Sequence, residues 1–265
     1  MNDLFPLKGS ITYELIDEAH KRLLRIAIEV RNVLERHGIP YSLVFGTVIG
    51  AVRHKGFIPW DMDMDFGTFD DYDKTVAILK KELPSWLVVL DHTEDPNYLA
   101  SWVKIVDRYS EFHATMFEGD NKFKYRGLHV DLYHIKKTTY NSYPEYKKQE
   151  ALDYYERKYD AGLLTEKQLE DYKKTVENAY QQDLQGRVKL AEDKPEYAFL
   201  KFFEGDVDSI FPLKPYVFEG EKFMGPNNHD KYLKGCYYKG DYMQFPPYEQ
   251  RDMKIDELII KPINC

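Results

Sequence analysis

Three aspartates at alternate positions are the residues of this chain whose types and spacing most directly indicate chemistry. Asp61, Asp63 and Asp65 alternate with apolar residues in the segment that runs from Trp60 to Phe66. If this segment is a β-strand, the three carboxylates share one face, because successive side chains of a strand point to opposite faces. Like charges repel one another unless a cation lies among them, and Mg²⁺ prefers such oxygen ligands. The pattern predicts a metal site, with a solvated acidic face on an exposed edge strand as the alternative.

A glycine turn and a basic cluster lie before the acidic segment, and both are predicted to contact phosphate. Gly46 and Thr47 follow a short apolar run and precede a stretch of small residues. Backbone N–H groups at such a turn can approach a phosphate, helped by the N-terminus of the following helix. Arg53, His54 and Lys55 are predicted to clamp a diphosphate, with a solvated basic turn as the alternative.

Lys104 and Arg126 are two further candidates for contact with a small anionic substrate. Lys104 belongs to a strand-like run, and Arg126 precedes a second short apolar run that contains one acid. The sequence leaves open whether Lys104 reaches the acidic residues, and a plain turn is the alternative for Arg126.

The order of the predicted elements alternates helices with short strands. Apolar residues at three- and four-residue spacing predict a helix from Tyr13 to His37, which Gly38 ends. Short runs of β-branched and aromatic residues predict strands. The predicted strands besides the acidic segment are Tyr41–Phe45, Trp86–Leu90, Ser101–Asp107 and Leu128–Tyr133, and two further helices are predicted at Val48–Val52 and Asp71–Leu83. The composition from Tyr143 to Ala191 predicts two or three helices, and a hairpin is predicted at Glu219–Glu221.

Composition narrows the class of protein. The chain has 265 residues and a formal net charge of −8, which argues against a general nucleic-acid binder because such proteins need basic surfaces. Its only cysteines, Cys236 and Cys265, form no CxxC pair, so neither a structural zinc site nor a disulfide is expected. The N-terminal residues lack an apolar signal core and no run is long enough to span a bilayer, which predicts a cytoplasmic protein.

Two motifs resemble those of the LicD family within the nucleotidyltransferase superfamily. The first reads FGTVIGAVRHKGFIPWD and covers residues 45–61. The second consists of Tyr232-Leu233, Tyr242-Met243, Pro246-Pro247 and Arg251. Two departures from the family pattern are Met62, where the family usually has a middle acid, and the segment Tyr133-His134-Ile135-Lys136, where it often has a Phe-Pro-Leu-Asp-like turn.

The resemblance implies an α/β (α+β) fold, with a nucleotidyltransferase-like mixed sheet flanked by helices and a helical insertion. It also implies one catalytic domain over residues 1–265. Residues 1–140 would form the nucleotidyltransferase-like core, residues 141–208 the helical insertion, and residues 209–265 a C-terminal segment that packs on the core.

The same resemblance implies an activity and a set of partners. The expected enzyme transfers phosphocholine from CDP-choline to a sugar hydroxyl of a cell-surface glycan precursor, such as teichoic acid, and releases CMP. Its cofactor would be Mg²⁺, with Mn²⁺ as an option, and a lipid-linked acceptor would place it at the inner face of the membrane. Ribitol phosphate, glycerol phosphate and nucleotidyl transfer itself stay open as alternatives. A glycan-binding module that keeps only the fold is the non-enzymatic alternative.

Residue roles follow from the matched positions. Asp63 and Asp65 match the paired metal ligands of the superfamily, and Asp131 matches its third acid. Asp131 would bind metal or accept a proton from the attacking hydroxyl, whereas a capping or turn aspartate is the plain alternative. Asp61 would be a further ligand or a support for the others. A choline group would need an aromatic cage, for which Trp102, Tyr133, Tyr238 and Tyr242 are available although each of them could equally belong to the core.

Overall fold

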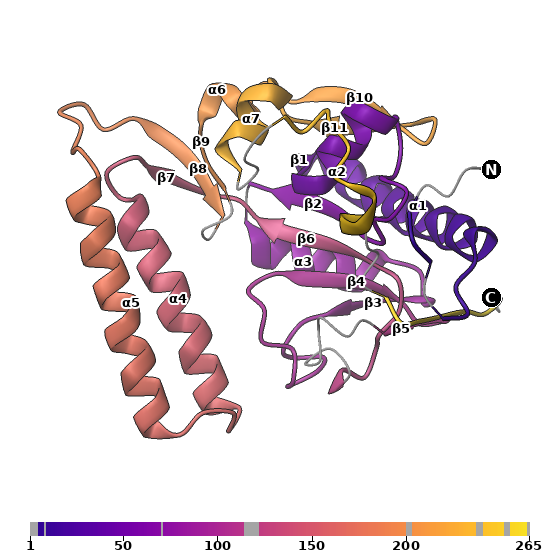
Figure 1. Cartoon of the computed structure of the whole chain (residues 1–265), viewed down its shortest axis with the longest axis horizontal. Coiled ribbons are helices and arrows are strands. Elements are labelled where there is room, and N and C mark those ends of the chain that lie inside the picture. Colours follow the sequence, from indigo (N-terminus) through magenta and orange to yellow (C-terminus); the bar gives the residue numbers. More distant parts are fainter. Residues whose placement is uncertain are drawn as a thin grey trace.

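A five-stranded mixed sheet forms the centre of the molecule in this computed structural model (Figure 1). The model describes residues 5–7, 9–69, 71–113, 122–199, 203–236, 241–251 and 255–263. The strand order is β1-β2-β6-β4-β3, and the strands are β1 (Tyr41–Leu43), β2 (Met64–Thr68), β3 (Leu87–Leu90), β4 (Val103–Asp107) and β6 (His129–His134). β2 and β6 run parallel, and the other neighbours run antiparallel. The expected mixed α/β fold is confirmed.

Two helices cover one face of this sheet and supply much of the core. α1 (Tyr13–Arg36) begins where the Thr12 side chain accepts a hydrogen bond from the backbone N–H of Leu15, and the chain turns at Gly38 with φ of +62°. Its apolar stripe, which includes the fully buried Leu23 and Ile26, contacts β4 and β6. α3 (Tyr72–Glu82) packs beside α1 and is also predicted correctly from the sequence.

The first part of the segment between β1 and β2, residues 45–54, is helical. α2 (Phe45–Ile49) continues directly into a π-helical turn (Gly50–His54), and Lys55 then adopts a left-handed conformation with φ of 62°. Gly46 and Thr47 therefore lie inside a helix, and the predicted separate turn before that helix is wrong. Apolar residues surround this segment: Phe45, Val48 and Ile49 are all buried, and their burial favours a compact helix over an open loop.

A helical hairpin projects from one side of the sheet (Figure 1). It consists of α4 (Tyr143–Asp160) and α5 (Glu166–Gly186), with Gly162 at φ of +72° in the connection. α5 begins with a capping box in which the side chains of Thr165 and Gln168 each bind the backbone of the other. The predicted helical insertion at residues 141–208 is not helical throughout, because β8 (Pro195–Phe199) and β9 (Phe203–Asp206) follow the hairpin and form a three-stranded sheet with β7 (Lys136–Thr139).

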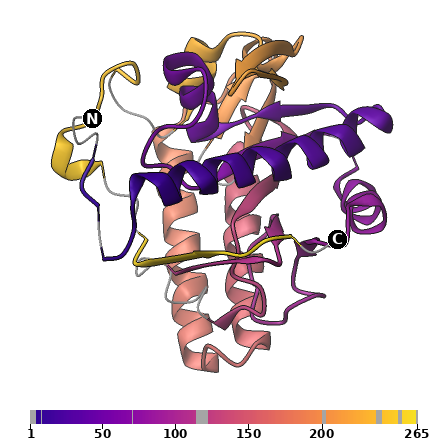
Figure 2. The same cartoon turned by 90° about the vertical axis from the view of Figure 1, so that its right-hand side faces the viewer.

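The C-terminal part of the chain returns to the core. It contains α6 (Val207–Ile210), the hairpin β10 (Lys214–Phe218) and β11 (Glu221–Gly225), α7 (His229–Gly235), a 3₁₀ turn (Tyr248–Gln250) and β12 (Glu257–Ile260). The hairpin turn predicted at Glu219–Glu221 is confirmed. β12 pairs with β5 (Ser110–His113), and Figure 2 shows β12 in yellow crossing below α1. Within the described residues, no helix combines the length and the apolar character that crossing a membrane requires.

Candidate active site

Strand pairing brings two distant aspartates side by side. In the parallel ladder of β2 and β6, Asp65 pairs with Asp131, and on the other side of β6 the partner of Asp131 is Lys104 of β4. Paired residues on adjacent strands point to the same face of a sheet. Asp63 completes the group, and one ligand oxygen from each of Asp63, Asp65 and Asp131 lies within 4.8 Å of the others. We call these three residues the carboxylate trio.

The acidic segment is not a strand over its whole length. β2 begins at Met64, so Asp61 and Asp63 lie just before it, and the expectation that all three acids share a strand face is wrong. Asp61 is not part of the trio found among the described residues, but its side chain forms a hydrogen bond with Asp63. Its backbone oxygen also lies 2.8 Å from Nε2 of His20, whose ring stacks on Phe57. Asp61 therefore supports the trio from outside.

Burial and mutual repulsion make the trio electrostatically unfavourable without a cation. Burial raises the pKa of the Asp65 carboxyl well above its usual value, and the charges of Asp63 and Asp131 raise it further. The pKa of Asp63 is also raised, first by burial and then by Asp131, while Lys104 opposes the shift. A divalent cation would relieve this repulsion, and carboxylate oxygens are the ligands that such an ion prefers. The trio could therefore hold a metal ion.

Neighbouring hydroxyl groups fix the positions of the two strand carboxylates. The Thr47 side chain accepts a hydrogen bond of 2.8 Å from the backbone N–H of Asp65, which ties α2 to β2. Tyr133 follows Asp131 on the same face of β6, and its hydroxyl lies 3.2 Å from Asp65 Oδ1 and 3.1 Å from Asp131 Oδ2. A tyrosine hydroxyl has one proton to donate, so it can bridge two carboxylates fully only when one of them carries a proton or shares its charge with a cation.

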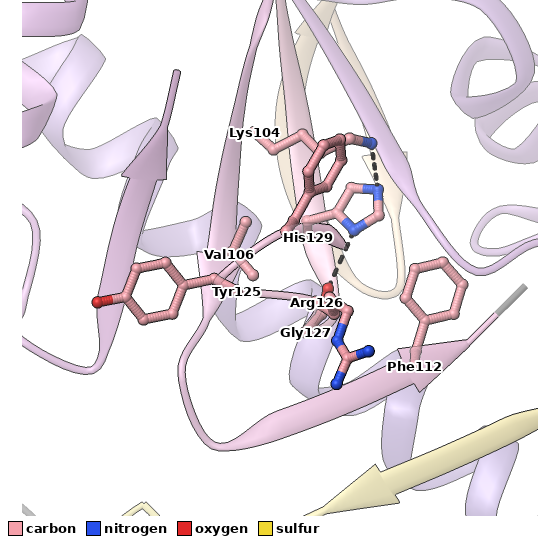
Figure 3. A pocket seen from close by; sticks show the side chains of 8 residues that line it. Lys104, Val106, Phe112, Tyr125, Arg126, Gly127 and His129 are labelled. Atoms are coloured by element: carbon pink, nitrogen blue, oxygen red, sulfur yellow. Dashed lines mark hydrogen bonds between the residues drawn. The ribbon is translucent and has the colours of Figure 1, made fainter. Parts of the chain in front are cut away.

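Lys104 provides a cationic side chain beside the trio, as the sequence left open. Its Nζ lies 3.1 Å from Asp131 Oδ1 and 2.8 Å from His129 Nε2. Burial and the Lys104 charge lower the pKa of His129 to about 4, so this imidazole is neutral at physiological pH. Figure 3 shows the two side chains facing each other in a pocket that Phe112 and Arg126 also line.

The other predicted phosphate ligands make contacts away from the trio. The guanidinium group of Arg53 donates hydrogen bonds of 2.7 and 2.9 Å to the backbone oxygens of Tyr242 and Gln244, and it lies over the ring of Phe245. His54 stacks on Phe245, and burial lowers its pKa to about 4. Lys55 is exposed, and its backbone oxygen accepts a hydrogen bond from the N–H of Glu219. These contacts tie the basic cluster to the C-terminal segment.

Arg126 and Arg251 each contact a partner elsewhere in the chain. Arg126 forms an ion pair with Glu111 of β5. Arg251 donates a hydrogen bond to the backbone oxygen of Pro246 and lies over the rings of Trp60 and Phe245. Gly46 is partly exposed in the first turn of α2. The phosphate-binding roles of Gly46, Thr47, Arg53, His54, Lys55 and Arg126 stay predictions.

Aromatic side chains close the site on one side. Tyr133, Trp102 and Phe199 lie with their ring centres 4.8 to 6.0 Å apart, and Phe45 packs against Tyr133. Tyr133 and Phe199 are buried, which is typical of a packed core. Tyr242 hydrogen-bonds to Asp230 at the surface, and Tyr238 lies outside the described residues.

The sequence does not predict the contacts that Tyr133, His129 and His20 make around the trio and Asp61. It marks Tyr133 only as a possible cage residue, and it gives no role to His129 or His20. His129, Asp131 and Tyr133 alternate along β6, so the strand period that placed the aspartates together also marks the two flanking residues. The contact of His20 with Asp61 has no comparable signal, because it joins α1 to a loop that is distant in sequence.

Comparison with known proteins agrees with this geometry. The family of LicD/FKTN/FKRP nucleotidyltransferase domains matches residues 38–160, a range that contains all three members of the trio. Residues 38–160 therefore carry a nucleotidyltransferase domain of the LicD/FKTN/FKRP family. The lipopolysaccharide cholinephosphotransferase LicD of Haemophilus influenzae is 28% identical over 254 residues, which cover 85% of this chain and 91% of the relative.

Two further relatives are similar over shorter stretches. The ribitol 5-phosphate transferase FKRP of Mus musculus is 43% identical over 49 residues, which cover 18% of this chain and 10% of that protein. An uncharacterised protein of Rickettsia prowazekii is 24% identical over 140 residues, which cover 44% of this chain and 52% of the relative. The named relatives are therefore transferases that differ in the group they transfer.

Proposed function

We propose that this chain transfers phosphocholine from CDP-choline to a sugar hydroxyl of a cell-surface glycan precursor and releases CMP. The observation that carries the proposal is the convergence of Asp63, Asp65 and Asp131 within 4.8 Å, in a chain that resembles a cholinephosphotransferase over 85% of its length. Three carboxylates, two of them buried, and one lysine suit a reaction in which charged phosphate groups must be bound and oriented.

The residues present fit a divalent cation. The trio supplies hard oxygen ligands, and Asp131 Oδ1 is buried without a well-directed hydrogen bond, its close neighbour being the Lys104 ammonium at 3.1 Å. Asp63, Asp65 and Asp131 would hold Mg²⁺ or Mn²⁺. When bound, such an ion neutralises negative charge that develops on phosphate oxygens.

Each protein group has a proposed role in the transfer. Asp131 would accept the proton of the attacking sugar hydroxyl, and Asp63 and Asp65 would fix the donor's diphosphate through their cation. Lys104 would stabilise negative charge on the phosphate nearest to Asp131. Thr47 and Tyr133 position Asp65, since they contact its backbone N–H and its carboxylate.

Ribitol phosphate is the second candidate for the transferred group. The 43% identity to a ribitol 5-phosphate transferase favours it, but this identity covers only 49 residues. Phosphocholine is preferred because the cholinephosphotransferase is similar over most of both chains.

A panel of CDP-alcohols tests the proposal. The purified protein would be incubated with Mg²⁺ and CDP-choline, CDP-ribitol or CDP-glycerol, with and without a glycan acceptor, while the release of CMP is followed. We expect CMP to form fastest from CDP-choline, and Asp65→Asn to abolish its formation. Faster release from CDP-ribitol would select the second candidate, release of pyrophosphate from a nucleoside triphosphate would indicate nucleotidyl transfer, and no turnover with any donor would contradict an enzymatic role.

A further inference from the structure

The Lys104 ammonium occupies a defined position between two groups of β6. Because Lys104 and Asp131 are paired in the antiparallel ladder of β4 and β6, the lysine side chain rises on the same face as the trio. Its Nζ lies 3.1 Å from Asp131 Oδ1, 3.4 Å from Asp131 Oδ2 and 2.8 Å from His129 Nε2. The lysine side chain is only 14% exposed, so water screens this contact less than it screens a surface ion pair.

The orientation of His129 explains why the ammonium stays there. Nδ1 of His129 lies 3.0 Å from the backbone oxygen of Gly127, and a carbonyl oxygen can only accept a hydrogen bond (Figure 3). Nδ1 therefore carries the proton, and Nε2 presents its lone pair to Lys104. The lysine thus donates to His129 and to Asp131 at once, and the side chain is held on both sides.

The charge balance gives this contact a consequence for metal binding. Three ionised carboxylates carry a formal charge of −3, and Lys104 reduces it to −2, which one divalent cation neutralises. The ammonium also repels any cation that binds to Asp131 from a few ångströms away, in surroundings where such interactions are stronger than in water.

We infer that Lys104 is a resident counter-ion of the carboxylate trio, held in place by His129 as a positioning residue, and that this pair limits how tightly the free protein binds a divalent cation. The inference deepens the proposed function and rests on its metal site. It predicts that removing the lysine charge strengthens metal binding, whereas loss of an ordinary structural contact would leave binding unchanged or weaken it.

The test measures the binding of Mn²⁺ alone, without nucleotide, by calorimetry or by the electron paramagnetic resonance signal of the free ion. Lys104→Met keeps the length of the side chain and removes its charge, and we expect its dissociation constant for Mn²⁺ to fall by about tenfold or more. Lys104→Arg keeps the charge and should bind Mn²⁺ much as the unchanged protein does. Lys136→Met is the matched control, because Lys136 lies in β7 of a different sheet, pairs with Glu150 of α4, and its loss changes the net charge equally.

His129 is tested through its dependence on Lys104. His129→Leu removes the acceptor and should strengthen Mn²⁺ binding in the same direction, whereas His129→Gln keeps an acceptor oxygen and should restore the weaker binding. In the Lys104→Met background, His129→Leu should not change Mn²⁺ binding further, because no lysine ammonium is left for His129 to position. Should His129→Leu fail to fold, as thermal unfolding would show, the Lys104 variants still decide the question.

The outcomes separate this inference from the function on which it rests. If the unchanged protein binds Mn²⁺ no better than Asp65→Asn does, the trio is not a metal site and the proposed function fails with it. If the unchanged protein binds Mn²⁺ and Lys104→Met binds it no more tightly, only the counter-ion role is overturned. Equal strengthening by Lys136→Met would overturn it too, since the effect would then follow from net charge.

Discussion

Burial, charge repulsion and hydrogen bonding all act on the Asp65 carboxylate. This carboxylate is 7% exposed, it lies beside two other carboxylates, and the Tyr133 hydroxyl is its neighbour at 3.2 Å. Burial raises the pKa of the Asp65 carboxyl above about 3.8, its value in the unfolded chain. At a pH above this value, ionisation of Asp65 therefore destabilises the metal-free fold. The functional requirement for a negative charge therefore opposes the stability of the fold at this residue.

Asp65→Asn separates these two effects. In the presence of a chelator at pH 7.5 we expect the variant to melt at the same temperature as the unchanged protein or higher, because it removes a repelled charge and keeps the shape. The difference should vanish as the pH falls toward 4, where the raised pKa leaves the aspartate protonated. The rise in melting temperature that Mg²⁺ produces should be lost, as should CMP release.

Differential scanning fluorimetry with and without Mg²⁺ measures this prediction. The control is Asp17→Asn, which removes an exposed carboxylate paired with Lys21 and should change neither the metal response nor, beyond small effects, the stability. An equal response to Mg²⁺ in Asp65→Asn and the unchanged protein would show that the ion binds elsewhere.

At the level of elements, the β10–β11 hairpin holds the basic turn that precedes the acidic segment. Glu219 and Gly220 have φ of 50° and 79°, as a two-residue hairpin loop with both central residues at positive φ requires. The Glu219 carboxylate accepts a hydrogen bond of 3.0 Å from the backbone N–H of Phe57, and its own N–H donates to the oxygen of Lys55. Gly56 leaves the space for this carboxylate, since a Cβ there would lie 1.8 Å from Glu219 Oε1.

Gly56→Ala is expected to act through Glu219. The added methyl group would displace the carboxylate and leave the buried N–H of Phe57 without its acceptor, at a cost of about 1–3 kcal/mol in the free energy of unfolding. Glu219→Ala should cost a similar amount for the same reason. The double variant should then be about as stable as Glu219→Ala alone, because the clash is gone. Chemical denaturation of the four proteins checks this, and additive losses would contradict it.

The strand pair β8–β9 carries a second pH-sensitive feature. Burial and the neighbouring Glu204 raise the pKa of Glu196 to about 7, although Arg187, which binds Glu204 at 2.6 and 2.8 Å, opposes the shift. A raised carboxyl pKa means that the folded protein binds more protons than the unfolded chain between pH 4.5 and 7. Its contribution to stability is therefore fully present below pH 4.5 and lost as the pH rises through 7.

Glu196→Gln should remove this dependence, because an amide resembles the protonated carboxyl and cannot ionise. We expect its melting temperature to exceed that of the unchanged protein by about 1 to 3 °C at pH 8, after allowance for partial solvent screening, and to match it near pH 4.5. Glu192→Gln, at an exposed position, is the matched control for the change in net charge. A difference in melting temperature between Glu196→Gln and the unchanged protein that is equal at both pH values would contradict the raised pKa of Glu196.

On the scale of the whole molecule, one buried ion pair joins three distant parts of the chain. Arg22 of α1 donates to Asp107 of β4 at 2.9 Å and to the backbone oxygen of Lys261, just after β12. The Asp107 side chain is fully buried, and the Arg22 side chain is only 12% exposed. The N-terminal helix, the central sheet and the C-terminal strand therefore share one charged contact.

Arg22→Met should destabilise the protein by about 3–5 kcal/mol, because it leaves the buried Asp107 charge without its cationic partner. Adding Asp107→Asn should recover part of that loss. Arg25→Met on the same helix is the matched control, since Arg25 is exposed, lies over the Trp86 ring, and should cost only about 0.5–1 kcal/mol when lost. Equilibrium unfolding in urea measures all four proteins, and equal losses for Arg22→Met and Arg25→Met would contradict a special role for the pair.

Elements with local signals could be predicted from the amino-acid sequence alone. The apolar stripe and Gly38 define α1, the short apolar runs define β3, β4 and β6, and the glycine-containing loop defines the β10–β11 hairpin. The aspartates of the candidate metal site could also be recognised, because three like charges in an apolar setting are unfavourable without a counter-ion. β7, β8 and β9 were missed, since short half-exposed strands gain their stability from neighbours that a local window does not contain.

Which of the acidic and basic side chains contact one another depends on the three-dimensional fold. The parallel pairing of β2 with β6 puts Asp65 beside Asp131, and the antiparallel pairing of β6 with β4 adds Lys104, whereas Arg53 faces the C-terminal segment and Arg126 pairs with Glu111. The physical reason is register: a shift of one residue along a strand turns a side chain to the opposite face. That register is set by the burial of the apolar residues of the sheet against its helices.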